Sequence, residues 1–484
     1  MKLLKRIDDN LLKWLLVIFV FFIPLYPKFP FHIVNYTYIA IRLDDFFVAL
    51  ISGVFLIQIL RGKIKWREML FLKPIVAFWG IVFLSFVSGL YLTHTIDYPL
   101  VGFLNAARRV EYMVVFFIAA QCIRTIKDFR LILYSLFGSL LLVDLYGIGQ
   151  RFFNFPAIST MNPEFAKGQI LYLTEDARLS STFAGHYDLG AYLVFLMPLL
   201  WGLVMYGKRV IGLVLILLSA FILTLTASRA SSMAYLISTL GFLIYFRKVR
   251  YAFFVIVLAA GLAYLNTDLL QRWLKTVQIR QIVLNELTGE EIVVQNIQSD
   301  KLAAGTSYVK IRDDKDSTAS SLLKDDLIAK ASLSGGLNAS PEGRYETVSA
   351  VTTDISISTR LQISWPRAMN AFKRNPLLGT GPSSITESSD GDYMRWLGET
   401  GILGFGMFLY VIFIIVKKIY GARAKLPSAA RALPVAILFG TFGLLINATL
   451  IDIFEASKVA YTFWLTLGIF VGLILLDKKE LKTI

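Results

Sequence analysis

Long apolar segments alternate with shorter polar connections along most of the chain. A helix that crosses a bilayer needs about 20 mostly apolar residues, because each residue rises only about 1.5 Å. Twelve segments are candidates for such helices, at residues 11–27, 44–60, 74–92, 110–123, 131–149, 188–206, 209–226, 230–246, 250–266, 394–416, 433–451 and 459–476. These segments are continuous rather than alternating, which excludes a barrel. The pattern predicts an all-α polytopic membrane protein with about twelve transmembrane helices.

Composition supports this prediction and narrows the chemistry. The 484 residues are 56% hydrophobic and only 17% charged, whereas about a quarter of the residues in soluble domains are charged. Cys122 is the single cysteine and lies in an apolar segment, and the three histidines are scattered. We therefore expect no intrachain disulfide, no metal site and no cofactor. The first apolar segment lacks a small-residue cleavage site and is expected to be a retained span.

The positive charges predict an orientation. With the N-terminus inside, the inside loops are 1–10, 61–73, 124–130, 207–208, 247–249, 417–432 and 477–484, and every one contains lysine or arginine. The positive-inside rule then places both termini in the cytoplasm. Much of the net charge of +15 is explained in this way, so nucleic-acid binding loses its main support.

Two long segments, 150–187 and 267–393, fall on the outer face in this orientation. We expect transmembrane helices 1–9 in residues 1–266, an extracytoplasmic insert in 267–355, an extracytoplasmic catalytic loop in 356–393, and helices 10–12 in 394–484. Short alternating runs at 291–294 and 308–311 predict a few strands within a small α+β insert. The Ser/Gly/Asn-rich stretch 332–341 is typical of a linker.

The first candidate for function is Arg229, which follows Ser228 in a short hydroxyl-rich connection between two spans. Ionisable residues near a membrane are costly and are therefore functional candidates. The next helix begins at this point, so its N-terminal amides and positive dipole end would face the same anion. An interfacial arginine that reaches a lipid phosphate is the alternative. We expect Arg229 to be catalytic and Ser228 to contact the substrate.

A second candidate group precedes another span, in the stretch 178–188. Arg178 and His186 are the expected substrate-binding residues. The alternative is a capped helix entry, with Asp188 near the first turn.

The loop before the tenth span contains a third group. Arg360, Trp365, Arg367, Met369 and Phe372 have the spacing of an amphipathic helix that lies on the bilayer surface. Arg360 is expected to be catalytic, because its guanidinium can bond a phosphate in a bidentate fork, and Arg367 to bind the substrate. The following stretch, 375–382, is rich in Pro and Gly and predicts turns.

Acidic residues at the mouth of the tenth span form a fourth group. Asp392, Arg395 and Glu399 fall near one face of a helix, and for Glu399 we expect a structural ion pair. Asp390 and Asp392 are candidates for a general base, and Tyr393 for substrate binding. Near the last span, a salt-bridged cap is expected from Asp452, Glu455 and Lys458.

The order of these motifs resembles that of the O-antigen polymerase and ligase superfamily (Wzy-type and WaaL-type). The matching elements are Ser181-Thr182-Phe183 before a span, Ser228-Arg229-Ala230 between spans, Arg360 and Trp365 before the turn 376–381, and the helix from Tyr393 through Glu399, Gly401 and Gly404. The resemblance covers about 170–476. It implies a metal-independent glycosyltransferase whose donor is a glycan on undecaprenyl diphosphate. Arginines matching Arg229 and Arg360 would hold the diphosphate as the carrier leaves.

One departure from this pattern bears on the reaction. Ligase-type members have a histidine just before the Tyr-Leu helix, whereas Asp390-Gly391-Asp392 stands here and no histidine follows His186. This difference favours a polymerase, which joins lipid-linked repeat units. The alternatives are a ligase that transfers glycan to a lipid or protein acceptor, and a secondary transporter that depends on the mid-span Asp144. The insert is a candidate binding region for a partner such as a chain-length regulator.

Overall fold

The computed structural model describes residues 2–33, 40–159, 168–174, 177–266, 277–285, 308–313, 345–353, 359–385 and 390–481. The chain divides into two compact units. Unit 1 comprises Met1–Leu269 and Arg367–Ile484, and unit 2 comprises Leu270–Pro366.

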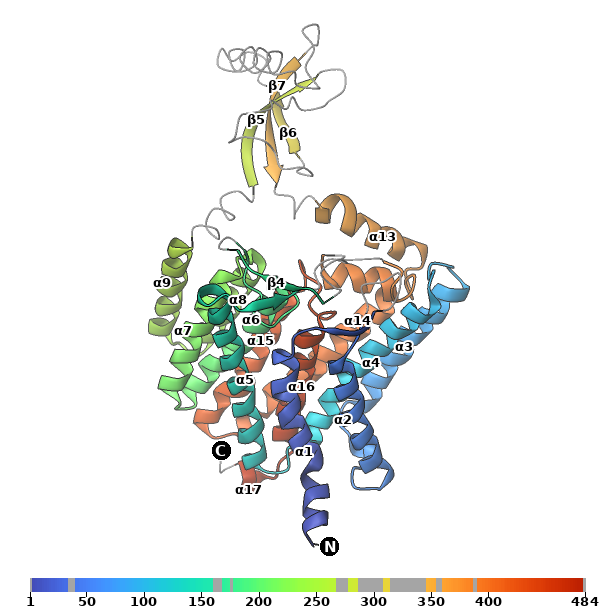
Figure 1. Cartoon of the computed structure of the whole chain (residues 1–484), viewed down its shortest axis with the longest axis vertical. Coiled ribbons are helices and arrows are strands. Elements are labelled where there is room, and N and C mark those ends of the chain that lie inside the picture. Colours follow the sequence, from blue (N-terminus) through green and yellow to red (C-terminus); the bar gives the residue numbers. More distant parts are fainter. Residues whose placement is uncertain are drawn as a thin grey trace. The chain divides into compact units, whose positions relative to one another are not determined.

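Unit 1 is a bundle of helices (Figure 1). Its helices are α1 (Lys2–Leu25), α2 (Leu43–Leu60), α3 (Leu72–Tyr91), α4 (Pro99–Cys122), α5 (Ile126–Phe152), α6 (His186–Met205), α7 (Arg209–Leu225), α8 (Arg229–Tyr245), α9 (Val249–Leu265), α14 (Asp392–Ala422), α15 (Ala432–Asn447), α16 (Ser457–Ile474) and α17 (Lys478–Leu481). Two antiparallel hairpins connect helices: β1 (Pro30–Ile33) with β2 (Ala40–Arg42), and β3 (Pro156–Ile158) with β4 (Ile170–Tyr172).

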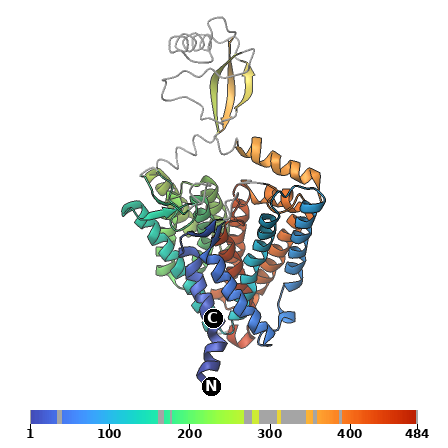
Figure 2. The same cartoon turned by 45° about the vertical axis from the view of Figure 1, so that its right-hand side comes forward.

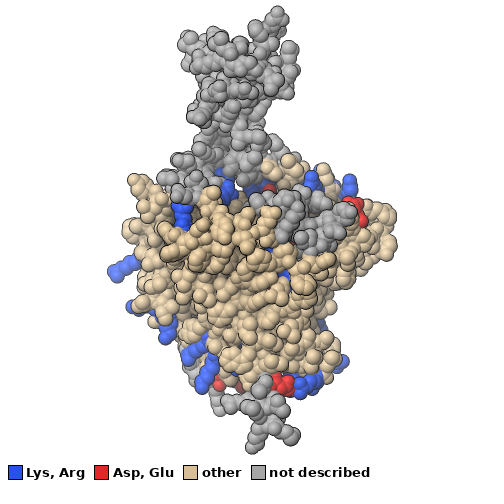
Figure 3. All heavy atoms as spheres, viewed as in Figure 1, with Lys and Arg blue, Asp and Glu red and all other residues tan. Residues whose placement is uncertain are grey.

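Each predicted apolar segment overlaps one of these helices. Among the described residues, six helices are long and apolar enough to cross a membrane, namely α2, α3, α5, α6, α14 and α16, and the apolar α7, α9 and α15 are shorter. On the face shown in Figure 3, charged side chains gather mainly toward the two ends of unit 1 and leave an uncharged middle. The chain is a helical membrane protein, and the count of twelve spans stays a prediction.

Helix α4 is much longer than the predicted segment 110–123. It begins at Pro99, whose fixed φ suits the first helical position. Three charged residues, Arg108, Arg109 and Glu111, lower the local hydropathy, so the apolar pattern does not detect the first half of this helix. Two of them have partners inside the bundle: Arg109 pairs with Glu399 and Glu455, and Glu111 accepts a hydrogen bond from Tyr461. Tertiary pairing therefore makes a charged segment compatible with a buried helix.

Helices α6 and α16 form the centre of unit 1. Helix α16 packs against α4, and α6 packs against α7 and α15; Figure 2 shows the bundle from a second side. Small residues allow this close approach, because a Cβ on Gly468 of α16 would lie 2.3 Å from the Phe116 carbonyl oxygen of α4. The centre is therefore set by backbone proximity as well as by apolar side chains.

Helix α14 is broken at Gly401, where φ is +63° and ψ is −170°. The turn 375–381 fits into the break. The amides of Ile402 and Leu403 donate to the carbonyls of Pro376 and Leu377, at 2.9 and 3.2 Å, and the Gly381 amide donates to the Glu399 carbonyl at 2.8 Å. Backbone groups freed by the break are thus satisfied by the turn, as an apolar environment requires.

Unit 2 contains a three-stranded antiparallel sheet in the order β5-β7-β6, from β5 (Val277–Asn285), β6 (Tyr308–Asp313) and β7 (Tyr345–Thr353). The strand predicted at 308–311 is confirmed, since it lies in β6. The run 291–294 and the linker 332–341 lie outside the described residues. A π-helical turn, Arg360–Ser364, leads into α13 (Trp365–Arg374), which crosses the boundary between the units.

Candidate active site

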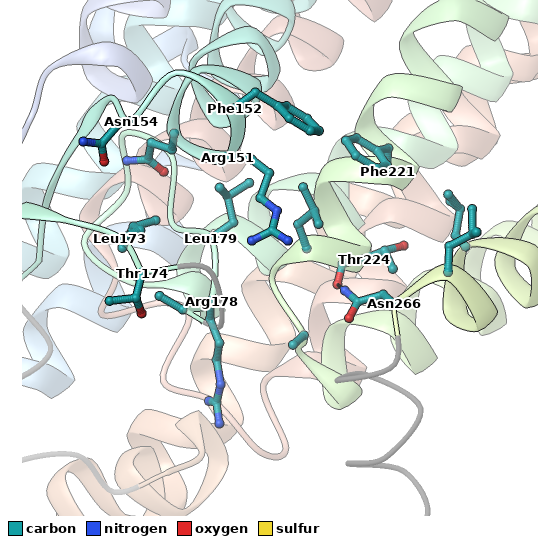
Figure 4. Close-up of a pocket in the computed structure, with 16 residues that line it drawn as sticks. Arg151, Phe152, Asn154, Leu173, Thr174, Arg178, Leu179, Phe221, Thr224 and Asn266 are labelled. Atoms are coloured by element: carbon teal, nitrogen blue, oxygen red, sulfur yellow. Dashed lines mark hydrogen bonds between the residues drawn. The ribbon is translucent and has the colours of Figure 1, made fainter.

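A cavity of about 630 Å³ lies among the ends of α5, α7 and α9. We refer to this end of unit 1, away from the N-terminus in Figure 1, as the far end. Figure 4 shows Arg151 extending from α5 into the space beside Leu179 and Thr224, and Arg178 on the neighbouring segment. The described lining residues include these two arginines and no carboxylate. The cavity therefore combines positive charge with both polar and apolar side chains, which suits an anionic group on an apolar chain.

The segment that bears Arg178 is fastened to three helices. The Leu179 amide donates to the Leu225 carbonyl of α7 at 3.1 Å. The Ser181 hydroxyl donates to the Val143 carbonyl of α5 at 2.7 Å, and the Thr182 hydroxyl donates to the Pro24 carbonyl of α1 at 2.6 Å. Hydrogen bonds from the hydroxyl-rich motif before α6 thus hold the segment that bears Arg178 at the cavity.

Arg178 and His186, both predicted to bind substrate, contact each other. Nη1 of Arg178 lies 2.8 Å from Nε2 of His186. Arginine can only donate, so Nε2 accepts and the ring proton is on Nδ1. His186 is buried at the start of α6, and its position orients the guanidinium of Arg178.

Arg229 is the first residue of α8, and its side chain is half-buried. Ser228 is the N-cap of this helix: its hydroxyl oxygen accepts from the Ser231 amide at 3.3 Å. Ala227, just before it, has a φ of +49° and also lines the cavity. The tight α7–α8 turn therefore carries Arg229 on the segment that borders the cavity, while Ser228 is buried in a capping role.

Arg360 and Arg367 lie on either side of the boundary between the units. Arg360 is 8% exposed in the π-helical turn of unit 2. Arg367 is exposed in the first turn of α13, on the helix that was predicted as amphipathic. The association of Arg360 with Arg229 stays a prediction, because the two residues belong to different units.

The acidic mouth of α14 is an ion-pair network. Arg109 of α4 pairs with Glu399 at 3.2 Å and with Glu455 at 2.5 Å, and Arg395 pairs with Asp452 at 3.1 Å and with Glu399 at 3.5 Å. This geometry supports the structural role expected for Glu399. Arg109 was not singled out from the sequence, because its partners Glu399 and Glu455 lie far away along the chain.

The predicted carboxylates Asp390 and Asp392 have different surroundings. Asp392 is fully buried, and its carboxylate accepts from the Ile453 and Phe454 amides, at 2.8 and 3.1 Å. Asp390 is partly exposed, in a left-handed conformation with φ of +49°. Tyr393 donates its hydroxyl to the Leu445 carbonyl at 2.6 Å, which ties α14 to α15.

The salt-bridged cap expected from Asp452, Glu455 and Lys458 is wrong. Asp452 pairs with Arg395 and Glu455 with Arg109. The ammonium of Lys458 donates instead to the Pro24 and Thr182 carbonyls, at 2.9 and 2.6 Å. Each of the three residues therefore contacts a different element. Buried charged groups need partners, and here the tertiary fold supplies them rather than neighbours in the sequence.

Comparison with known protein families finds a match in the middle of the chain. The family model described as O-antigen ligase matches residues 213–409, from α7 to α14. Within residues 213–409 the chain is similar to the O-antigen ligase family, which supports the predicted O-antigen polymerase and ligase superfamily. The resemblance predicted from the motif order is confirmed, and the matched range contains both Arg229 and Arg360. No curated protein matches the chain.

Proposed function

We propose that this protein is a membrane glycosyltransferase that polymerises undecaprenyl-diphosphate-linked oligosaccharide repeat units. In this proposal the far end of unit 1 faces outward from the bacterial inner membrane, and both termini are cytoplasmic. The observation that carries the proposal is the cavity bordered by Arg151, Arg178 and the α7–α8 turn with Arg229. Cations with no carboxylate among the described lining residues suit a diphosphate, and the apolar side chains suit a polyprenyl chain.

The reaction follows from the charge that develops at the leaving group. A hydroxyl of the acceptor glycan attacks the anomeric carbon of the donor, and the bond to the carrier diphosphate breaks. Negative charge then accumulates on the diphosphate, where Arg178, Arg229 and Arg360 would stabilise it. The N-terminal amides of α8 add to this field, since Arg229 is its first residue. Because arginines supply the compensating charge, we expect the reaction to need no metal.

A general base is needed to accept the proton of the attacking hydroxyl. Of the two predicted carboxylates, we assign this role to Asp390. Asp392 already accepts two backbone hydrogen bonds in a fully buried position, whereas Asp390 is partly exposed at the mouth of α14.

The ligase is the second candidate, and the description of the matched family favours it. A ligase would use the same donor and the same arginines, with a lipid or protein as acceptor. The transporter receives less support. Asp144, its expected coupling residue, is fully buried in α5 and accepts a hydrogen bond from Ser219 of α7 at 2.6 Å, which gives it a role in joining two helices.

Replacement of the arginines tests the proposal. We expect Arg229→Ala and Arg360→Ala each to abolish glycan ladders in cells that express the protein, with normal membrane insertion. Arg229→Lys should also fail, because lysine cannot make the bidentate contact. Arg209→Ala is a matched control, since Arg209 is likewise the first residue of a helix, α7, but is exposed at the opposite end. Wild-type ladders from the first two variants would contradict the proposal.

A further inference from the structure

Two buried cations at the far end have no partner within the described structure. Lys28, after α1, is 6% exposed, and Arg42, at the start of α2, is 7% exposed. Neither side chain forms an ion pair or a hydrogen bond with the described residues, and Nε of Arg42 is a buried donor without an acceptor. Burying an unpaired cation is strongly unfavourable, so such residues in membrane proteins are candidates for ligand contacts.

The charges around Lys28 come from four helices. Arg42 and Asp44 lie at the start of α2, Arg108 lies in α4, Asp188 lies in the first turn of α6 and Lys458 lies in the first turn of α16. Asp45 and Glu111 offset the charge of Arg108. The four cations Lys28, Arg42, Arg108 and Lys458 are matched in number by the carboxylates Asp44, Asp45, Asp188 and Glu111. Neither Lys28 nor Arg42 forms an ion pair with any of these carboxylates in the described structure, so a bound anion would give the two cations the direct partner that they lack there.

The pKa of Lys28 reflects its buried position. Burial, with a smaller contribution from the charge of Arg42, lowers the pKa of Lys28 to about 8. Asp188 and Asp44 oppose this change without cancelling it. A bound anion would raise the pKa again, because an adjacent negative charge favours the ammonium form. Anion binding and proton binding at Lys28 are therefore coupled.

This group lies next to the Arg151–Arg178 cavity but is separate from it. His186 contacts Arg178, whereas the charge of Asp188, two residues later on the same helical turn, acts on Lys28 and raises its pKa. Residues two apart on a helix point about 200° apart. The first turn of α6 therefore stands between the two groups of cations.

We propose that Lys28 and Arg42 form a second anion subsite, which binds the diphosphate of a lipid-linked glycan. The identity of the ligand rests on the proposed function. The diphosphate belongs either to the donor, whose carrier leaves, or to the acceptor, which keeps its carrier. Both sources present the same chemistry to the two cations.

Direct binding tests the subsite without any reaction. The probe is undecaprenyl diphosphate, titrated into the purified full-length protein in detergent between pH 6.5 and 9.5. We expect Lys28→Gln and Arg42→Gln to weaken binding at least tenfold at pH 7, with Lys65→Gln, an exposed lysine in the α2–α3 connection, as the control. Wild-type affinity should fall as pH rises through about 8, because deprotonated Lys28 no longer attracts the anion.

Lys28→Arg separates a binding role from a structural one. Arginine stays charged over this pH range, so this variant should bind the probe and lose the fall in affinity near pH 8. Wild-type affinity in both glutamine variants, or a wild-type affinity that does not change with pH, would overturn the subsite.

Two modified substrates then show whether the diphosphate at this subsite belongs to the donor or to the acceptor. A donor-only glycan has its acceptor hydroxyls blocked, and an acceptor-only glycan carries a non-cleavable phosphonate in place of the glycosyl phosphate. Lys28→Gln should raise the KM of one substrate at least tenfold and leave the other within twofold, and the affected substrate identifies the source. Unchanged KM values for both would overturn the subsite. Lys28-dependent binding of the probe by a protein that transfers no sugar would instead contradict the proposed function.

Discussion

Arginine residues at the far end of unit 1 differ in whether carboxylates surround them. Arg109 lies between Glu399 and Glu455 and stacks over the ring of Trp396, with its guanidinium carbon 5.0 Å from the ring centre. Arg178 instead contacts a neutral His186 nitrogen and borders a cavity. An arginine whose charge is already balanced holds helices together, whereas one that faces a cavity can serve a ligand.

Removal of Arg109 should destabilise the bundle. Arg109→Ala leaves Glu455 without its cation and Glu399 with Arg395 as its remaining one, and breaking a buried pair in this way costs about 3–5 kcal/mol. Arg61→Ala is the control, because Arg61 pairs with Asp8 at an exposed position and such pairs contribute at most about 1 kcal/mol. Thermal unfolding in detergent measures both variants. Equal melting temperatures for the two would contradict the structural role of Arg109.

Replacement of the two carboxylates at the mouth of α14 should have different effects, one on activity and the other on stability. Asp390→Asn is expected to lower the rate of sugar transfer by about 10²–10⁴, the usual contribution of a general base, at an unchanged melting temperature. Asp392→Asn should lower the melting temperature, because buried amides lose part of their acceptor at a cost of about 1–3 kcal/mol. The Asp390 assignment fails if Asp390→Asn transfers sugar at the wild-type rate.

At the scale of elements, the break in α14 depends on glycine. A Cβ on Gly401 would lie 2.4 Å from the backbone of Leu377, and its φ is positive. The turn 375–381 and the break fix each other through backbone hydrogen bonds. This arrangement places Asp390, Glu399 and Arg395 at the mouth of the helix, so the break shapes the end of the bundle where the site lies.

Substitution of Gly401 should disturb this arrangement. Gly401→Ala is expected to destabilise the protein by about 1–3 kcal/mol through overlap with the turn. Gly406→Ala, in the same helix with no atom within 4 Å, should be neutral or stabilising by up to about 1 kcal/mol. The measurement is the fraction of each variant that elutes as a monodisperse species after a heating series. A Gly401→Ala variant as stable as Gly406→Ala would contradict this interpretation.

The positions of helices could be predicted from the sequence where a single local pattern was sufficient. The apolar segments located their helices, and the hydroxyl-rich motif located the start of α8, because length, hydropathy and capping are local properties. The start of α4 was missed, since its charges have partners about 290–350 residues away. Lys28 and Arg42 were missed for the same reason: burial without a partner is a property of the fold, and each appears in the sequence as an ordinary loop cation.

At the scale of the whole molecule, the orientation predicted from the positive charges can be measured. Cys122 is buried, so Cys122→Ala gives a background without cysteine. His32→Cys, in the exposed β1 strand, should react with a membrane-impermeant maleimide in intact spheroplasts. Lys65→Cys, at the other end of the bundle, should react only after the membrane is opened. The reverse pattern would place the cavity in the cytoplasm and contradict the proposed function.

The most direct test of the central claim is a reaction with defined components. Purified full-length protein is incubated with an undecaprenyl-diphosphate-linked oligosaccharide, without added metal or nucleotide, and the products are resolved on a gel. The polymerase predicts a ladder of longer lipid-linked glycans with release of one undecaprenyl diphosphate for each bond formed. No ladder, but single transfer once a second acceptor is added, would make the protein a ligase. No transfer to any acceptor under conditions where the protein binds the donor would contradict a glycosyltransferase.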